Sequence, residues 1–151
     1  MDVDGSLTDG GIYISEQGEA FKKFDARDGL AIGILEKNGI KTAFLSHAKT
    51  PKIVEKRAEM LGISFCYAGN APKGEILQGW IDQLGITAEE VFYYGDDLND
   101  MDVMHMAGIV ACPQSATYQV KLKADYVCEK SSGDAAFREA AEYFWPHLFG
   151  L

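Results

Sequence analysis

Short apolar runs alternate with longer segments of helical periodicity along most of the chain, and this alternation restricts the possible folds more than any other feature. We predict strands at 41–45 (KTAFL), 63–67 (ISFCY), 91–94 (VFYY), 108–111 and 125–127, and helices at 50–61, 73–84 and 137–144. Gly85 is a natural stop for the second of these helices. The pattern predicts an α/β fold, with a mostly parallel, Rossmann-like sheet and helices on both faces.

One segment departs from the alternation. Residues 10–24 (GGIYISEQGEAFKKF) have the pattern of a β-hairpin, because Ile12 and Ile14 alternate with less apolar neighbours and Gln17-Gly18 can form a turn. A projecting hairpin with so many apolar residues would be prone to aggregation if it stayed exposed to solvent. We therefore expect it to pack against another subunit.

Length and composition are those of one globular domain, 1–151. The formal net charge of −9 argues against nonspecific nucleic-acid binding, which requires basic patches. The sequence has neither a run of about 18 apolar residues nor a basic and apolar leader, so we expect no membrane contact and a cytoplasmic location. The cysteines are three and widely spaced (Cys66, Cys112 and Cys128), which favours buried thiols over a disulfide framework or a zinc site.

Acidic residues gather at two places. Asp2 and Asp4 lie two residues apart at the start, and the segment 95–100 (GDDLND) follows the apolar run VFYY directly. Ligands of parallel α/β sheets bind beyond the carboxyl ends of the strands, where the second cluster lies. Capping of a helix by its acids explains one or two of these aspartates, whereas a divalent cation would offset the charge of all of them.

Two further residues suit a phosphate group. Ser46 ends the run KTAFL, where a hydroxyl and backbone amides at a strand-to-helix turn can bind an anion. Lys73 lies at the start of a predicted helix, a position that the helix dipole disfavours for a cation. Each signal is weak by itself, since serines are common in turns and most lysines are solvated.

Four motifs, in the order in which they occur, resemble those of the haloacid dehalogenase superfamily of phosphotransferases. They are Asp2-Val3-Asp4, Ser46, Lys73 and 95–100. Four further runs resemble the small sugar-acid phosphatases of this superfamily, so the likeness covers almost the whole chain. These runs are 2–10 (DVDGSLTDG), 22–24 (KKF), 27–29 (RDG) and 133–139. That group includes enzymes for the 8-phosphate of 3-deoxy-D-manno-octulosonate, a sugar acid of lipopolysaccharide biosynthesis, and for nine-carbon, sialic-acid-type keto-acid 9-phosphates.

The resemblance implies a Mg²⁺-dependent phosphatase. It implies that Asp2 attacks phosphorus and forms an aspartyl-phosphate, while Asp4 serves as acid and then base. Mg²⁺ would be held by the Asp2 carboxylate, the Asp4 backbone carbonyl and Asp96, with support from Asp100. Ser46 and Lys73 would bind the phosphoryl oxygens.

Roles in substrate binding are also implied. The candidates are Gly5, Asn99 (orienting Lys73 or the phosphate), Arg27 (for the substrate carboxylate), His47, and Gly133 or Arg138 reaching a neighbouring site. For Arg27 a surface ion pair, and for Arg138 an ordinary helix position, are alternatives from the residues themselves. The group forms homotetramers in which the hairpin closes a neighbour's site in place of a lid domain, which matches the hairpin 10–24.

Two departures from the family pattern stand out. An apolar strand of about five residues normally precedes the first aspartate, but here only Met1 does, so we expect a misplaced Asp2, reduced stability and low activity. Ser46-His47-Ala48 replaces the usual Gly and Arg or Glu after the motif serine, which leaves the choice between eight- and nine-carbon substrates open. The short start also permits another reading, a weakly active oligomerisation module of the kind fused to sialic-acid-activating enzymes.

Overall fold

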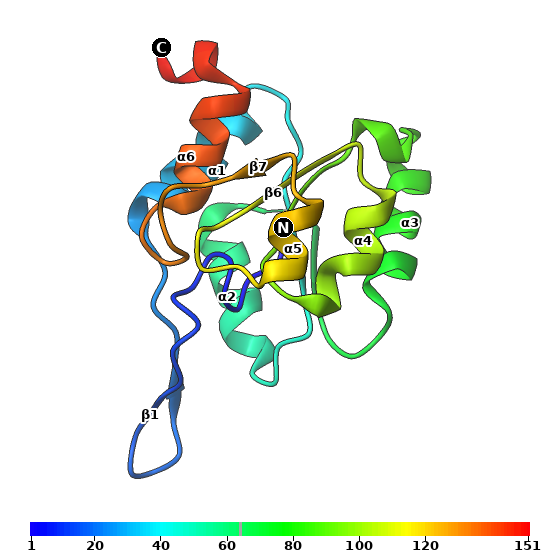
Figure 1. Ribbon diagram of the computed structural model, residues 1–151. Coiled ribbons are helices and arrows are strands. Elements are labelled where there is room, and N and C mark those ends of the chain that lie inside the picture. Colours follow the sequence, from blue (N-terminus) through cyan, green and yellow to red (C-terminus); the bar gives the residue numbers. More distant parts are fainter. Residues whose placement is uncertain (64) are drawn as a thin grey trace.

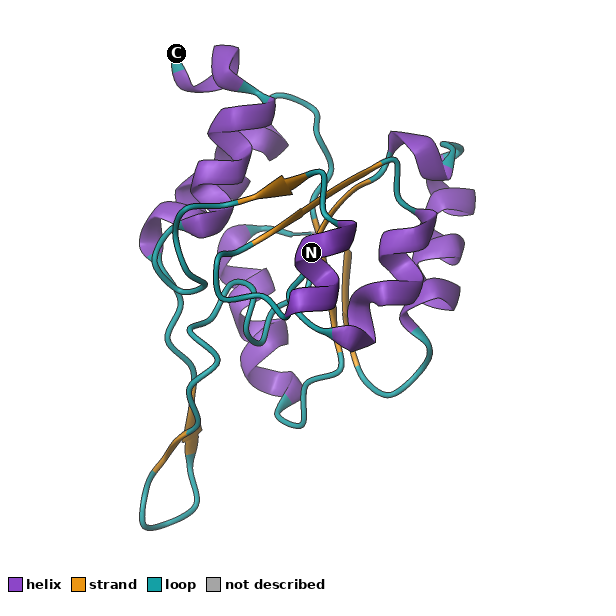
Figure 2. Cartoon of the chain, viewed as in Figure 1, coloured by secondary structure: helices purple, strands orange, loops and turns teal. Residues whose placement is uncertain are grey.

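Two groups of parallel strands lie between helices in the computed structural model, which describes residues 1–63 and 65–151 (Figures 1 and 2). The strands are β1 (Tyr13–Ile14), β2 (Ala20–Phe21), β3 (Ala43–Ser46), β4 (Phe65–Ala68), β5 (Phe92–Tyr94), β6 (Ile109–Cys112) and β7 (Tyr126–Val127). The helices are α1 (Ala26–Lys37), α2 (Pro51–Leu61), α3 (Lys73–Leu84), α4 (Met101–Met106), α5 (Tyr118–Lys123) and α6 (Ala136–Phe144). Short 3₁₀ helices are η1 (Ala88–Glu90), η2 (Leu98–Asp100) and η3 (Pro146–Phe149).

The first two residues join the two groups of strands. β3 pairs with β4, and β6 pairs with both β5 and β7, all in parallel. Between β3 and β5, the Met1 amine donates to the Ala43 carbonyl and the Leu45 N–H donates to the Met1 carbonyl, both at 2.9 Å. The Asp2 N–H donates to the Tyr94 carbonyl at 2.8 Å. Met1 and Asp2 thus form a short bridge in the plane of the sheet.

Consecutive strand residues point into two different cores. Phe44, Tyr94 and Ala111 belong to a core with α1, α2 and α6, whereas Leu45, Tyr93 and Val110 belong to a second core with α3, α4 and α5. The alternation of side chains along a strand produces this division. Burial on both faces explains why the strands read as continuous apolar runs. The α/β fold with parallel strands and helices on both faces confirms the prediction.

Most predicted elements are present with shifted ends. α3 has the predicted bounds, and Gly85 ends it with a left-handed backbone, φ 65°. The strand predicted at 63–67 begins instead at Phe65, and its residue 64 lies outside the described residues. The sequence pattern missed α1, whose Gly29 and Gly33 weaken the helical signal, and the six-residue helices α4 and α5, which are too short to show a period.

The segment 10–24 projects from the body of the molecule, at the bottom of Figure 1. β1 and β2 form an antiparallel pair with only two residues on each strand. The turn includes Gly18, whose φ is 82° and whose N–H donates to the Ser15 carbonyl. The side chains of Ile12, Ile14 and Phe21 are 92%, 67% and 58% exposed. The segment 10–24 thus contains an antiparallel pair of two-residue strands, a much shorter ladder than the predicted range.

Among the described residues, none of the helices combines the length and apolar character that crossing a membrane requires.

Candidate active site

The predicted acidic residues converge at the carboxyl ends of the strands. Asp2 follows the bridge between β3 and β5, while Asp96 and Asp100 come from the segment after β5 and from η2. One carboxylate oxygen from each of Asp2, Asp96 and Asp100 lies within 4.8 Å of the others. Asp2 lies in this cluster with its N–H bonded to the Tyr94 carbonyl, so the displacement of Asp2 that we expected is not present.

Lys73 lies fully buried between two of these carboxylates. Its Nζ donates to Asp2 Oδ1 and to Asp100 Oδ1, both at 2.7 Å. Its position on the first residue of α3, after Pro72, aims the side chain back toward the strand ends. Burial alone would lower the pKa of Lys73, but the two carboxylates outweigh it and raise that pKa, so the ammonium form is stabilised.

Asp100 is held by the protein on every side. Oδ1 also accepts from the Tyr93 hydroxyl at 2.6 Å, and Oδ2 accepts from the N–H groups of Asp96 and Asp97 at 2.9 Å and 3.3 Å. These bonds occupy a carboxylate's usual acceptor positions. Asp100 is therefore suited to fixing Lys73 and the loop 95–100, while Asp2 and Asp96 keep more oxygen lone pairs available.

Gly5 and Ser6 hold Asp96 in place. The Ser6 hydroxyl donates to Asp96 Oδ1 at 2.6 Å. Gly5 has a φ of 83°, and a Cβ at this position would lie 2.4 Å from Asp96 Oδ2. Glycine is therefore required on two counts, the left-handed backbone and the close approach. Gly5, which we predict to bind substrate, also makes room for the Asp96 carboxylate.

Asp2 and Asp96 carry raised pKa values. Burial, then the charge of Asp100, raises the pKa of Asp2 to about 6. Burial raises the pKa of Asp96 to about 8, the Ser6 hydrogen bond opposes the rise, and the charge of Asp2 adds to it. Buried carboxylates that repel one another resist ionisation unless a cation lies among them.

The donor set fits a hard divalent cation. Carboxylate oxygens are the ligands that Mg²⁺ prefers in proteins, and Lys73 neutralises only part of the charge of the three aspartates. Asp2 and Asp96 are the carboxylates best placed to hold such an ion.

Asp4 lies outside this cluster and pairs with a residue of the hairpin's return segment. Lys22 Nζ donates to Asp4 Oδ1, and the side chains of Lys22 and Asp4 are 15% and 39% exposed. Asp4 is thus more accessible than Asp2, which is 4% exposed. The two residues of the Asp2-Val3-Asp4 motif face different environments, one buried beside Lys73 and one open to incoming molecules.

Ser46 ends β3 at the same edge of the sheet. It is buried, and its Oγ accepts from the Ala48 N–H at 3.1 Å. His47 Nε2 lies 2.9 Å from the Ala71 carbonyl, so its ring links the loop after β3 to the loop before α3. His47, which we predict among the substrate-binding residues, thus lies beside the strand end that carries Ser46.

Of three other predicted residues, Arg27 and Arg138 have partners of their own, whereas Asn99 does not contact the residue that it was expected to orient. Lys73 bonds to Asp2 and Asp100, so the expected link between Asn99 and Lys73 is absent from the described contacts. Arg27 forms an ion pair with Asp25 and Asp134 at 2.8 Å, the surface alternative. Arg138 bonds to Glu142 and stacks on Phe149, as an ordinary helix residue does.

Sequence reasoning did not identify Ser6, Lys22 and Tyr93 as part of the site. Ser6 adjoins the first motif and Tyr93 adjoins the second. Their polar side chains beside a charged motif were the sequence signal that could have identified them as site residues. Lys22 is different, because only the folded hairpin brings it 18 positions back to Asp4.

Comparison with known proteins agrees with this geometry. Residues 36–139 match the family described as haloacid dehalogenase-like hydrolase. The chain is 37% identical over 142 residues to the 3-deoxy-D-manno-octulosonate 8-phosphate phosphatase of Escherichia coli K12, covering 94% of this chain and 75% of that protein. The crystal structure of the corresponding phosphatase from Yersinia pestis has a TM-score of 0.92 with 34% identity, covering 98% and 80% of the two chains.

A third relative was crystallised with ligands. The Moraxella catarrhalis 3-deoxy-D-manno-octulosonate 8-phosphate phosphatase, in complex with magnesium, phosphate and the sugar acid, has a TM-score of 0.91 with 34% identity, over 97% of this chain and 83% of that one. The family match covers Asp96 and Asp100 of the acidic cluster, and the sequence and structural likenesses cover 94% and 98% of this chain. The chain therefore belongs to the haloacid dehalogenase-like hydrolases.

Proposed function

We propose that this chain is a Mg²⁺-dependent phosphatase that hydrolyses 3-deoxy-D-manno-octulosonate 8-phosphate. The observation that carries the proposal is the buried arrangement of Asp2, Asp96, Asp100 and Lys73 at the strand ends, in a chain 37% identical over most of its length to phosphatases of that substrate. The product of this reaction is a sugar acid used in lipopolysaccharide biosynthesis.

The two aspartates of the first motif have different roles in the reaction. Asp2 attacks phosphorus, a bond forms between its carboxylate oxygen and phosphorus, and the bond to the sugar oxygen breaks. Asp4, which is the more exposed of the two, gives its proton to that leaving oxygen. It then takes a proton from a water molecule, which attacks phosphorus, releases phosphate and restores Asp2.

Basic and hydroxyl groups assist the transfer. Lys73, with its ammonium fixed by Asp100, offsets the negative charge on the phosphoryl oxygens. Ser46, at the end of β3, offers a hydroxyl at the same edge of the sheet. Asp2 and Asp96, with the Asp4 carbonyl, would hold Mg²⁺, which when bound favours the ionised carboxylates and polarises the phosphoryl group.

The hairpin supports a homotetramer. Ile12, Ile14 and Phe21 expose apolar surface on a projection too small to be stable alone. In our proposal the hairpins bury this surface against neighbouring subunits and close their sites in place of a lid. Asn99 and Arg27 would then contact substrate after leaving their present positions. The three cysteines are free thiols, which favours a reducing, cytoplasmic setting.

A substrate comparison tests the proposal. Phosphate release should be fastest with the eight-carbon 8-phosphate, require Mg²⁺, and disappear in Asp2→Asn. Preference for a nine-carbon keto-acid 9-phosphate would instead assign the chain to that alternative substrate class. A well-folded tetramer with no turnover on either substrate or on an aryl phosphate would contradict the enzymatic proposal and favour an oligomerisation module.

A further inference from the structure

A closed ring of contacts joins the loop after β3 to the loop before α3. The Gly69 N–H donates to the Ser46 carbonyl at 3.0 Å, which ties the end of β4 to the end of β3. The Ala71 N–H donates to the Tyr67 hydroxyl at 2.8 Å, and the Ala71 carbonyl lies 2.9 Å from His47 Nε2. Since a carbonyl only accepts hydrogen bonds, His47 Nε2 is the donor. Both polar groups of the Ala71 backbone are therefore held by side chains.

The register of the two strands brings the Tyr67 hydroxyl to this loop. Tyr67 pairs with Leu45 across the parallel ladder, so both side chains point toward the core that α3 covers. Gly69 leaves the space that the hydroxyl needs, because a Cβ on Gly69 would lie 2.6 Å from the Tyr67 oxygen. A side chain at position 69 would therefore displace the hydroxyl that accepts from Ala71.

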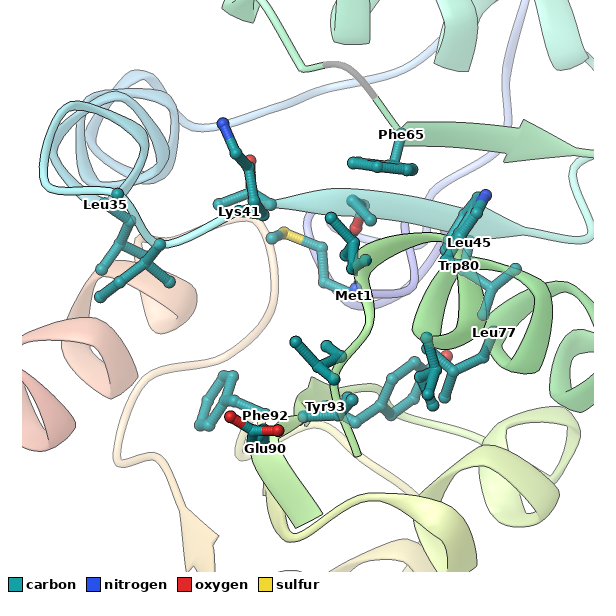
Figure 3. A pocket seen from close by; sticks show the side chains of 18 of the residues that line it. Met1, Leu35, Lys41, Leu45, Phe65, Leu77, Trp80, Glu90, Phe92 and Tyr93 are labelled. Carbon is teal, nitrogen blue, oxygen red and sulfur yellow. Dashed lines mark hydrogen bonds between the residues drawn. The ribbon is translucent and has the colours of Figure 1, made fainter. Parts of the chain in front are cut away.

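The body of α3 is fixed separately, by apolar packing on the same face of the strands. Leu77 shares a core with Leu45, and the Trp80 ring contacts the Phe65 ring edge to face at a centroid distance of 5.8 Å. Figure 3 shows Leu77 and Trp80 beside Leu45. These contacts lie about one and two helical turns beyond Lys73, so they do not by themselves determine how the first residue of the helix is placed.

The ring holds the segment from which α3 starts. Pro72, the N-cap of α3, has no N–H to donate and provides no capping side chain. The two bonds of Ala71 are thus the anchors that immediately precede Pro72 and Lys73. At the opposite side of the ring, His47 follows Ser46 directly in the chain. One set of bonds therefore fixes Ser46 and Lys73 relative to each other.

We propose that His47 and Tyr67 are positioning residues that hold Ser46 and Lys73 in the relative position that phosphoryl transfer requires. Because phosphoryl binding by Ser46 and Lys73 is itself part of the proposed function, this role rests on that function. Both side chains act through Ala71 and need no contact with the substrate. A displacement of about 1 Å at a group that contacts the reacting atoms can slow a reaction about 10²-fold, so these bonds matter for turnover.

Four variants test the ring by turnover. Tyr67→Phe removes the hydroxyl that accepts from Ala71, and His47→Ala removes the donor to the Ala71 carbonyl. Each should lower kcat at least about tenfold and change KM less than about twofold, on the sugar-acid phosphate and on nitrophenyl phosphate alike. His47→Gln keeps a side-chain N–H and should restore kcat to within about threefold of the unmodified protein. Tyr143→Phe, which removes an exposed hydroxyl on α6, is the control and should leave turnover unchanged.

Two comparisons separate positioning from other roles. A loss confined to the sugar-acid phosphate would show that His47 contacts the substrate itself, which would overturn the inference, as would equal losses in His47→Gln and His47→Ala. The double variant Tyr67→Phe/His47→Ala should be about as active as the less active single variant, because both substitutions release the same loop. Losses that multiply in the double variant would show that the two residues act independently and would also overturn it.

Amide exchange separates this inference from the proposed function. The Ala71 N–H should exchange at least about tenfold faster in Tyr67→Phe than in the unmodified protein or in Tyr143→Phe, whether or not the chain hydrolyses a phosphate ester. Unchanged Ala71 exchange in Tyr67→Phe would overturn the inference. Absence of turnover in the unmodified protein, with Ala71 exchange changed as expected, would contradict the proposed function and leave the placement of Lys73 by the ring intact.

Discussion

Lys73 Nζ lies 2.7 Å from Asp2 Oδ1, and both side chains are buried at the carboxyl ends of the strands. The residues are 71 positions apart in the chain. Asp100 completes the arrangement from the other side of Nζ. The proposed nucleophile is thus positioned beside the cation that would offset the charge of the transferred phosphoryl group.

Replacing Lys73 should affect both stability and turnover. In Lys73→Met, loss of the ammonium leaves Asp2 and Asp100 buried without a counter-ion, which should destabilise the Mg²⁺-free protein by about 3–5 kcal/mol. Turnover should fall about 10²- to 10³-fold. Denaturant unfolding in the presence of a chelator and steady-state kinetics measure these effects. Lys52→Met, at an exposed position on α2, is the control and should match the unmodified protein.

Lys22 should influence the reaction through Asp4. In Lys22→Met, Asp4 loses the ammonium that holds it, so protonation of the leaving oxygen becomes less effective. We expect a drop in kcat of about tenfold or more for an alkyl phosphate and little change for a nitrophenyl phosphate, whose leaving group needs no proton. Lys23→Met removes the neighbouring cation, which bonds the Gly133 carbonyl, and should affect both substrates alike. An equal loss on both substrates in Lys22→Met would contradict this role.

Gly5 and Gly18 form a matched pair for testing the close approach to Asp96. Their φ values are 83° and 82°, but a Cβ would meet Asp96 Oδ2 at Gly5 and nothing within 4 Å at Gly18. Both alanine variants lose about 1 kcal/mol from the strained backbone. Only Gly5→Ala should also weaken Mg²⁺ binding, by about tenfold or more because it displaces a proposed ligand. Titration with Mg²⁺, followed by calorimetry, measures the difference.

Asp28, which lies outside the catalytic cluster, should make the stability of the protein depend on pH. It is 3% exposed, its Oδ1 accepts from the Arg138 N–H, and its Oδ2 has no partner in the described structure. Burial raises the pKa of Asp28 to about 6 from a usual value of 3.8, so the folded state holds its proton longer than the unfolded state. The free energy of unfolding should therefore fall as pH rises from about 4 to 6.

Asp28→Asn should remove the part of that fall that Asp28 causes, while the parts caused by Asp2 and Asp96 remain. The variant should be more stable than the unmodified protein by up to about 3 kcal/mol at pH 7, and the gain should vanish below about pH 4. Asp82→Asn, at an exposed position on α3, provides the comparison. A stability difference for Asp28→Asn that is the same at pH 4 and pH 7 would show that the carboxyl is not held protonated by the fold.

Local patterns predicted the parts of the site that lie at the ends of strands and helices. The runs before Ser46 and Gly95 are apolar and short, so the position of the following polar residues relative to the sheet could be inferred. Lys73 could be recognised because it begins a helix with a clear period. For these residues, sequence neighbours determine where the side chain lies.

Contacts between distant segments could not be inferred in the same way. Arg27 bonds Asp134, 107 positions away, and His47 bonds the Ala71 carbonyl, 24 positions away, and no local pattern indicates these partners. The pairing of Lys22 with Asp4 depends on the path of the hairpin. Likewise, the position of Asp2 depends on bonds to Ala43, Leu45 and Tyr94, which are properties of the assembled sheet.

Trapping the phosphorylated protein tests the central claim most directly. Asp4→Asn should still transfer phosphate from nitrophenyl phosphate in the presence of Mg²⁺, but without Asp4 to activate water the acyl phosphate should accumulate. Acid quenching followed by peptide mass spectrometry should then find the phosphate on Asp2. No phosphorylated protein, or a phosphate on Asp96 or another residue, would contradict the assignment of Asp2 as the nucleophile.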